Sequence, residues 1–373
     1  MDKIKRFIDI FVPVTTCTLR CHYCYITHHR LFGGTLPKFQ YSPEHVRKAL
    51  STERLGGKCI INICGAGETL LPPEIPHYVK ELLIEGHYVM IVTNATINKA
   101  FSVFEEFEPC LLERLFFKFS LHYIELKKRN LLERFAENVN KMKELGSSFT
   151  VEVTPSDELI PYIDELKDFS LKKFGAVPHF TVARDEHCMS EIPILTHLSI
   201  DDYKKTWSQM KSEMFDFKFS TFSKKRNEFC YAGDWSFLLN LGNGEMRQCY
   251  NSPLVQYIFD DINKPIKFQA IGHNCQMPHC FNSHAFLTFG TIPELTFPTY
   301  DKMRNRICDN GSQWLSTTMK NFMCQKLVEN NSEYTTSKKY YTDLYMKYLV
   351  FKRESSFFNK VRTMLSHIKH ILH

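Results

Sequence analysis

Three cysteines lie within eight residues near the start of the chain, in the stretch CTLRCHYC. Cys17, Cys21 and Cys24 follow the spacing C-x3-C-x2-C. Thiolates are soft ligands for transition metals, and such short spacings let one loop bring three of them onto one centre. A fourth ligand from elsewhere in the chain would close the site. Without one, the centre keeps an open position for a bound molecule.

A histidine close by is the competing interpretation. His22, His28 and His29 are candidates to close a zinc knuckle with the three thiolates. Structural zinc sites normally pair their ligands from two separate turns. One loop with three cysteines therefore favours the open centre.

Four more cysteines form a second group, and they are Cys230, Cys249, Cys275 and Cys280. The first two frame Gly244 in the pattern C-x13-G-x4-C. The surrounding stretch, 229–290, is rich in Cys, Gly, Asn and Pro and is too irregular to build a large core. A cross-link such as a bound metal is therefore needed to stabilise it. Four thiolates would complete a closed centre, which is either an iron-sulfur cluster or a zinc ion.

The elements that position these groups alternate along the first half of the chain. Short runs rich in β-branched and aromatic residues predict strands at 7–14, 58–65, 87–93, 114–121, 149–154 and 178–183. Helical spacing predicts helices at 42–55, 72–86, 97–107, 131–146 and 155–175. This alternation predicts an α/β fold with a partial (β/α)6 TIM-like barrel. Functional residues should then lie at the carboxyl ends of the strands, as the three-cysteine loop does.

The alternation of strands and helices ends near residue 195, which predicts that the chain has three parts. Residues 1–195 form the barrel. Residues 196–290 hold a linker helix, LSIDDYKKTWSQM, and a small cysteine-rich domain. Residues 291–373 are expected to form a helical C-terminal segment.

The three-cysteine loop, with Tyr23 just before its last cysteine, resembles the signature of the radical S-adenosylmethionine (radical SAM) superfamily. The resemblance implies a [4Fe-4S] cluster whose free iron binds SAM, and an enzyme that begins catalysis with a 5′-deoxyadenosyl radical. It also implies roles for further motifs, namely GAGE (65–68), TNAT (93–96) and FKFSLH (117–122). Residues expected to line SAM are Gly65, Gly67, Glu68, Asn94 and Ser120, with Glu68 accepting the SAM ammonium. Many relatives carry Asp where this chain has His122.

Arg184, expected at the end of the sixth strand, is a candidate for the SAM carboxylate, because guanidinium binds carboxylate through two parallel hydrogen bonds. An ion pair with Asp185 or Glu186 is the alternative. The C-x13-G-x4-C pattern resembles the opening hairpin of SPASM and Twitch extensions. That resemblance implies one auxiliary [4Fe-4S] cluster on the second cysteine group.

Composition places the chain among ordinary globular proteins, with 43% hydrophobic and 24% charged residues. Its thirteen cysteines favour metal or redox chemistry in a cytoplasmic protein, where disulfides are rare. The start of the chain does not resemble a secretory signal. The net charge of +6 is matched by a basic surplus of six in residues 336–373, so the main domain lacks the charge expected for binding nucleic acid.

Two further features predict roles outside the clusters. Cys188, on the loop after the sixth strand, is a candidate donor of a hydrogen atom to a substrate radical, as in a radical epimerase. The tail 355–373 predicts an amphipathic helix with basic residues on its polar face, which fits peripheral contact with an anionic membrane. Packing of this helix against the barrel or a partner is the alternative.

The resemblance leaves the substrate open. An oxidoreductase or epimerase acting on a saccharide or related small polar molecule is favoured, because the first strand begins near residue 7 and leaves no room for an N-terminal peptide-recognition domain. A maturase of ribosomally made peptides is the alternative, and a non-catalytic, metal-stabilised binding protein is a third reading. The enzyme readings require an external electron donor such as flavodoxin or ferredoxin.

Overall fold

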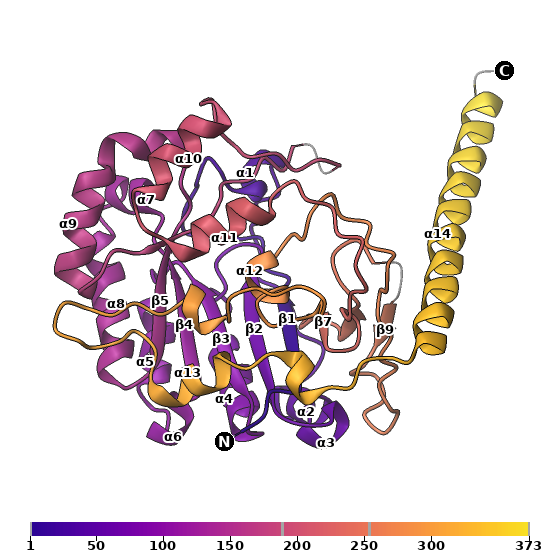
Figure 1. Cartoon of the computed structure of the whole chain (residues 1–373), viewed down its shortest axis with the longest axis horizontal. Helices are drawn as coiled ribbons and strands as arrows, with labels where there is room; N and C mark the ends of the chain where they lie inside the picture. Colours follow the sequence, from indigo (N-terminus) through magenta and orange to yellow (C-terminus); the bar gives the residue numbers. More distant parts are fainter. Residues whose placement is uncertain (1, 188–189, 253–254, 372–373) are drawn as a thin grey trace.

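A single twisted sheet runs through the molecule. The structure, a computed structural model of the chain, describes residues 2–187, 190–252 and 255–371, with side chains up to residue 355 apart from those of residues 255 and 354. Within these residues the sheet has nine strands in the order β6-β5-β4-β3-β2-β1-β7-β8-β9. The first six pair in parallel and in chain order, with helices packed around them (Figure 1). This is an α/β fold with a mostly parallel sheet, consistent with a partial TIM barrel.

The six predicted strands are all present. Their bounds are β1 Arg6–Val12, β2 Cys59–Gly65, β3 Tyr88–Thr93, β4 Leu115–Ser120, β5 Ser148–Val153 and β6 His179–Phe180. The sixth is shorter than predicted. The side chain of Ser212 accepts from the backbone N of Phe180 at 2.8 Å, so this N–H bonds to a side chain instead of to a neighbouring strand.

The helices follow the predicted segments, with two of them divided. Their bounds are α1 Tyr25–His28, α2 Pro43–Ala49, α3 Thr52–Leu55, α4 Ile75–Ile84, α5 Asn98–Phe104, α6 Pro109–Leu112, α7 Tyr123–Lys128, α8 Leu132–Glu144, α9 Ile163–Phe174, α10 Ile200–Ser208, α11 Glu213–Thr221, α12 Ser283–Phe286, α13 Thr317–Met323 and α14 Thr336–Ile371. The helix predicted at 42–55 is split because Ser51 caps a new helix. The one predicted at 155–175 starts as a 3-10 turn, Asp157–Tyr162, which contains Pro161.

The expectation of a helical segment from residue 291 onward is wrong for its first part. Residues 291–335 are mostly irregular, with α13 and the 3-10 turns Asp301–Met303 and Leu327–Asn330. Prolines interrupt this stretch, and its apolar side chains fill a core instead of forming one helical face. Phe322, for example, stacks on Tyr88 of β3 with ring centroids 3.6 Å apart. Only α14 is a long helix.

Strand β7 (Ser236–Asn240) joins the two cysteine-bearing parts of the chain. It pairs in parallel with β1, and β8 (Glu245–Arg247) and β9 (Val255–Tyr257) continue the sheet in antiparallel fashion. The sheet therefore runs through the expected boundary at residue 195, and the three-part division stays a prediction. Gly244 takes φ +75° in the β7–β8 turn, where a Cβ would lie 2.6 Å from Phe259.

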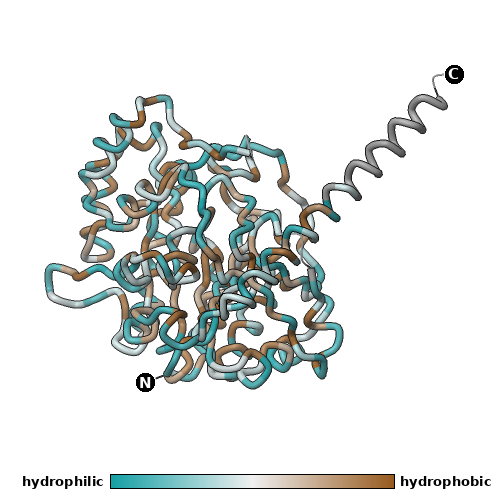
Figure 2. Tube along the Cα trace, turned by 45° about the vertical axis from the view of Figure 1, so that its right-hand side comes forward, coloured by the Kyte–Doolittle hydropathy of each residue, from teal (hydrophilic) through white to brown (hydrophobic). Residues whose placement is uncertain are grey.

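The core lies between the sheet and the helices. Figure 2 shows the hydrophobic segments concentrated toward the interior of the molecule. A second cluster on the other side of the sheet joins β1 to residues 285–334. The helical crossovers thus leave the carboxyl ends of β1 to β4 together at one edge. Among the described helices, none has both the length and the hydropathy that a bilayer crossing requires.

Candidate active site and metal centres

The carboxyl ends of β1 to β4 surround a cavity of about 170 Å³. It brings together the predicted residues from four loops. Those lining it are Cys17, Cys21, Cys24, Gly65, Gly67, Glu68, Asn94 and Ser120. The three-cysteine loop follows β1, GAGE ends β2, TNAT ends β3 and Ser120 ends β4. The edge of the sheet predicted to carry function therefore holds a pocket with three thiols.

The three thiols are largely withdrawn from solvent. Burial raises the pKa of Cys17 to about 11, and it raises the pKa of Cys21 and Cys24 as well. Buried thiolates need a positive charge to stabilise them, and a metal centre supplies it. The donor set of the cavity therefore fits a thiolate-ligated metal.

The glycines of GAGE let two loops touch. A Cβ on Gly67 would lie 2.1 Å from the carbonyl oxygen of Thr16, the residue just before Cys17. Because Gly67 has no side chain, the two backbones come close enough to bond. The backbone N of Gly67 donates to the carbonyl of Val14 at 2.5 Å, and the backbone N of Glu68 donates to the carbonyl of Thr16 at 3.0 Å. The motif was expected to bring backbone close to a ligand; here it also fixes the three-cysteine loop against β2.

Glu68 is buried and ties the ends of β2 and β3 together. Its Oε1 accepts from Thr93 Oγ1 at 2.6 Å and from the backbone N of Leu70 at 3.0 Å, and its Oε2 accepts from the backbone N of Asn94 at 2.8 Å. Burial raises the pKa of this carboxyl group. A carboxylate oxygen accepts two bonds, so Oε2 retains capacity for one more donor.

Asn94 is oriented by two threonines. Its Oδ1 accepts from Thr96 Oγ1 at 2.7 Å, and its Nδ2 donates to Thr18 Oγ1 at 3.0 Å and lies 3.7 Å from Cys17 Sγ. Hydrogen bonds to cluster sulfurs tune reduction potentials. Sequence reasoning missed Thr18 and Thr96, although both lie inside the motifs it singled out.

His122, which stands where many relatives of the expected family carry Asp, also lines the cavity. Its Nδ1 lies 2.8 Å from the hydroxyl of Tyr23. Burial lowers the pKa of His122 to about 4, so the ring is neutral. The histidines considered as zinc ligands lie elsewhere. His22 pairs with Glu158 at 2.7 Å, and His28 stacks on His187.

Arg184 is not among the residues that line this cavity. It pairs with Glu186 at 3.1 Å and donates to the carbonyl of Phe281 at 3.2 Å, with its guanidinium stacked 3.8 Å over the ring of Phe281. The ion pair that was the alternative is thus present. Arg184 joins the end of the barrel to the segment of the second cysteine group. Cys188 lies outside the described residues.

The second group of cysteines lines another, smaller cavity. Cys230, Cys249, Cys275 and Cys280 all border it. Burial raises the pKa of each thiol, with the neighbouring cysteines contributing for all but Cys275. The hairpin β7–β8 lies between the first two, with Cys230 before β7 and Cys249 after β8.

A chain of polar side chains runs from the strands of the barrel to the second cavity, which Tyr250 and Asn282 line. Asp9 accepts from Asn62 at 2.7 Å and from the hydroxyl of Tyr250 at 2.9 Å, and Asn282 donates to the same hydroxyl at 2.7 Å. Lys118 donates to Asn62 at 3.4 Å. Asp9, Asn62 and Lys118 are at most 8% exposed. The interior of the barrel is therefore polar, which the strand patterns did not indicate.

One comparison with known proteins covers the loops of the first cavity. Residues 11–158 match the model of the radical SAM superfamily. No curated protein is similar enough to the chain to count as a match. Similar solved structures include SuiB from Streptococcus suis bound to S-adenosylmethionine, at 14% identity and a TM-score of 0.49, with 69% of this chain and 65% of that chain covered.

Two other solved structures are similar at a lower TM-score. anSMEcpe with bound AdoMet and Cp18Cys peptide has 12% identity and a TM-score of 0.42, covering 95% of this chain and 99% of that chain. BtrN in complex with AdoMet and 2-DOIA has 14% identity and a TM-score of 0.32, covering 70% of this chain and 84% of that chain. For SuiB, described above, the matched part amounts to 65% of the length of that chain. The family match covers the three-cysteine loop, GAGE and TNAT, so residues 11–158 are similar to the radical SAM superfamily.

Proposed function

We propose that the chain is an iron-sulfur enzyme in which Cys17, Cys21 and Cys24 hold a [4Fe-4S] cluster and leave one iron to SAM. The observation that carries this proposal is the cavity that the three thiols share with GAGE and the end of β3, inside the matched segment. When bound, the cluster supplies the electron that cleaves SAM reductively to a 5′-deoxyadenosyl radical, which abstracts hydrogen from the substrate.

The residues around the cluster would bind and orient SAM. Glu68 suits the SAM ammonium, because a buried carboxylate with a raised pKa gains stability from a cation and Oε2 can accept one more bond. Gly65, Gly67, Asn94 and Ser120 line the same cavity and would surround the remainder of the molecule. Arg184 stays a candidate for the SAM carboxylate only if it leaves its pair with Glu186.

The second cysteine group would hold one auxiliary [4Fe-4S] cluster, as in SPASM and Twitch extensions. Support comes from the four thiols that line one cavity. Zinc at this site remains the alternative. An iron-sulfur cluster there would accept the electron that a substrate radical gives up as it is oxidised, which zinc does not do.

The substrate proposed is a saccharide or related small polar molecule, which the enzyme oxidises or epimerises. A ribosomally made peptide is the alternative substrate. The electron would come from an external donor such as flavodoxin or ferredoxin.

Anaerobic reconstitution tests the chemistry. Protein loaded with iron and sulfide, reduced with dithionite and given SAM should release 5′-deoxyadenosine, and Cys21→Ala should abolish this release. Cys280→Ala is the matched variant for the auxiliary site, and it should keep the release while it lowers iron from about eight to about four per chain. If the wild-type protein and its variants all release no 5′-deoxyadenosine, the chain is better explained as a metal-stabilised binding protein. Cys188→Ala with unchanged turnover and product stereochemistry would exclude the hydrogen-donor role.

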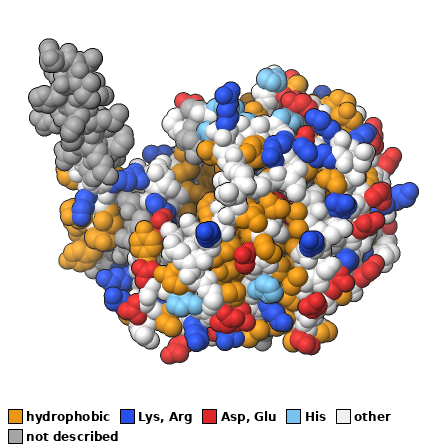
Figure 3. Space-filling model, turned by 180° about the vertical axis from the view of Figure 1, so that it is seen from behind, with side chains coloured by type: hydrophobic (Ala, Val, Ile, Leu, Met, Phe, Trp, Pro, Cys, Tyr) orange, Lys and Arg blue, Asp and Glu red, His pale blue; other side chains and the backbone are white. Residues whose placement is uncertain are grey.

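We also propose peripheral membrane contact through α14. Six large side chains that share one helical face are between 45% and 69% exposed, and they are Tyr340, Tyr341, Leu344, Tyr345, Tyr348 and Phe351. The opposite face packs on the body of the protein, where Met346 is buried and Asp343 accepts from His273. Figure 3 shows these hydrophobic side chains at the foot of the helix, with Lys and Arg beside them.

Aromatic residues next to basic ones suit the interface of an anionic bilayer. The protein should co-sediment with vesicles that contain phosphatidylserine, and it should not co-sediment with purely zwitterionic vesicles. The Tyr341→Ser/Tyr348→Ser/Phe351→Ser variant should lose this binding. Binding retained after deletion of 355–373 would exclude the role expected for the tail, and absence of binding by the full chain would exclude the contact altogether.

A further inference from the structure

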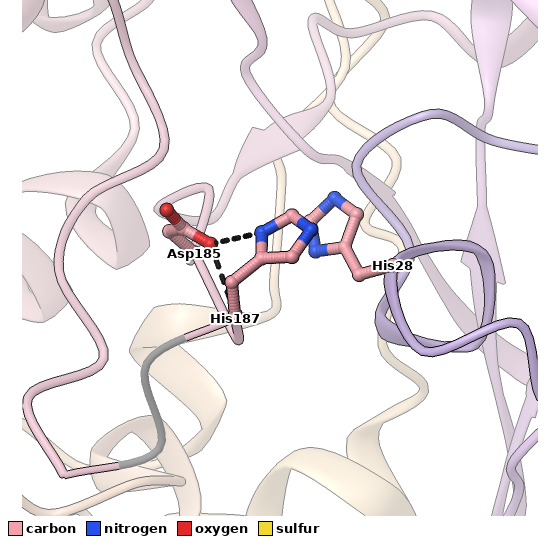
Figure 4. A group of neighbouring side chains, drawn as sticks. All are labelled: His28, Asp185 and His187. Atoms are coloured by element: carbon pink, nitrogen blue, oxygen red, sulfur yellow. Dashed lines mark hydrogen bonds and ion pairs between the residues drawn. The ribbon is translucent and has the colours of Figure 1, made fainter.

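A cluster of ligand-type side chains lies beside the three-cysteine loop but outside its cavity. His28 is the last residue of α1, which directly follows the loop, and Asp185 and His187 lie on the segment after β6. One ligand atom from each lies within 4.8 Å of the other two. Figure 4 shows the two imidazole rings against each other, with Asp185 on the far side of His187.

Asp185 fixes the orientation of His187. Its Oδ1 accepts from the backbone N of His187 at 3.0 Å and from Nδ1 of the same residue at 2.6 Å. A carboxylate only accepts, so Nδ1 carries the proton and the lone pair is on Nε2. Metal-ligating histidines commonly show this arrangement, in which a carboxylate holds the ring nitrogen that does not bind the metal.

His28 supplies a second nitrogen to the same place. Its ring stacks on that of His187, with centroids 4.1 Å apart and planes at 21°. The Nδ1 atom of His28 is buried, and no hydrogen-bond partner for it is found among the described residues. A buried polar atom without a partner is costly, and coordination of a cation would supply one.

The donor set selects the kind of ion. Imidazole nitrogens suit a divalent transition metal, above all Zn²⁺, whose coordination water can complete. His187 is exposed and the other two residues are partly buried, so an ion reaches the site from solvent. We propose that the imidazoles of His28 and His187 bind a divalent cation, with Zn²⁺ preferred, that Asp185 orients the ring of His187, and that this ion ties α1 to the segment after β6.

A bound ion would affect the active centre by fixing the segments next to it. Cys24 precedes α1, and Glu186 lies between Asp185 and His187 on the other segment. A bound ion would hold these two segments in one arrangement beside the thiols. This inference stands on the geometry of the three side chains and does not depend on the identity of the substrate.

Zinc binding to the cluster-loaded protein tests the proposal. Anaerobic equilibrium dialysis against ZnCl₂, followed by elemental analysis, counts zinc and iron in the same sample. The protein should hold about one zinc per chain more than His187→Ala or His28→Ala, at equal iron content. His29→Ala is the matched control, because His29 is exposed on the adjacent turn and its ring lies 6.4 Å from that of His187.

The comparison separates this site from other zinc-binding groups. Free thiols and auxiliary cysteines bind the same zinc in every variant, so they cancel in the difference. Exposed His187 can be replaced without disturbing the core, and the iron content reports whether the clusters stay loaded. Equal zinc stoichiometry and affinity in the wild type, His187→Ala and His29→Ala would overturn the proposal. Loss of 5′-deoxyadenosine release would bear on the enzyme function alone.

Discussion

The variant Gly67→Ala tests whether contact between two loops positions the three-cysteine loop. The added Cβ would lie 2.1 Å from the carbonyl oxygen of Thr16 and 2.7 Å from its carbonyl carbon. Real Cβ atoms essentially never come within 3.0 Å of such atoms, so the two backbones must separate by about 0.9 Å. Cys17 directly follows Thr16 and would move with it.

The cost follows from what that separation breaks. Backbone hydrogen bonds from Gly67 to Val14 and from Glu68 to Thr16 join the loops. Each contributes a net of about 0.5–1.5 kcal/mol, and overpacking costs about 1–3 kcal/mol. We expect Gly67→Ala to lower the free energy of unfolding by about 2–6 kcal/mol.

Gly34→Ala is the control, since a Cβ there meets nothing within 4 Å. It should leave stability unchanged or raise it by up to about 1 kcal/mol. Urea unfolding of cluster-free protein measures both variants under anaerobic conditions. After reconstitution, Gly34→Ala should hold about eight irons and Gly67→Ala about four. Equal stability and equal iron content in the two variants would refute the role assigned to this contact.

Three further predictions concern buried polar groups. Tyr23→Phe removes the hydroxyl beside Nδ1 of His122 and should lower the free energy of unfolding by about 1–3 kcal/mol in urea, with Tyr25→Phe as a neighbouring control. Arg304→Met should cost about 3–5 kcal/mol because it leaves Glu152 without its buried partner, and adding Glu152→Gln should restore part of the loss; an unchanged thermal midpoint would contradict this. The pKa of His87 is held below its ordinary 6.5 by burial, so the unfolded chain binds the extra proton and stability should fall as the pH drops below about 6.5, by up to about 1.4 kcal/mol per pH unit. His87→Asn should flatten this slope in urea titrations, and an identical slope would show that other groups set it.

Much of the barrel could be predicted from the sequence, because parallel strands covered on both faces are nearly continuous apolar runs. Ile60, Ile61 and Ile63 of β2 show why, since all three are buried. Strand β7 could not be assigned to this sheet in the same way. Its pairing with β1 joins segments more than 200 residues apart, and nothing in the local pattern of 236–240 encodes that partner.

The candidate site could be predicted where its residues sit in short motifs. Cys17 and Glu68 are examples, because each motif follows a strand and parallel strands end at one edge. The contacts that orient these residues could not be predicted. The bond between Tyr23 and His122 links positions 99 residues apart, and the pair of Arg184 with Glu186 depends on the conformation of the loop after β6.

Mössbauer spectroscopy tests the central claim most directly. Protein that carries Cys275→Ala and Cys280→Ala, loaded anaerobically with ⁵⁷Fe, should contain only the cluster held by Cys17, Cys21 and Cys24. Addition of SAM should then change the spectrum of one iron out of about four, because that iron alone lacks a protein thiolate. A spectrum unchanged by SAM, or a first site that holds zinc in place of iron, would contradict the account.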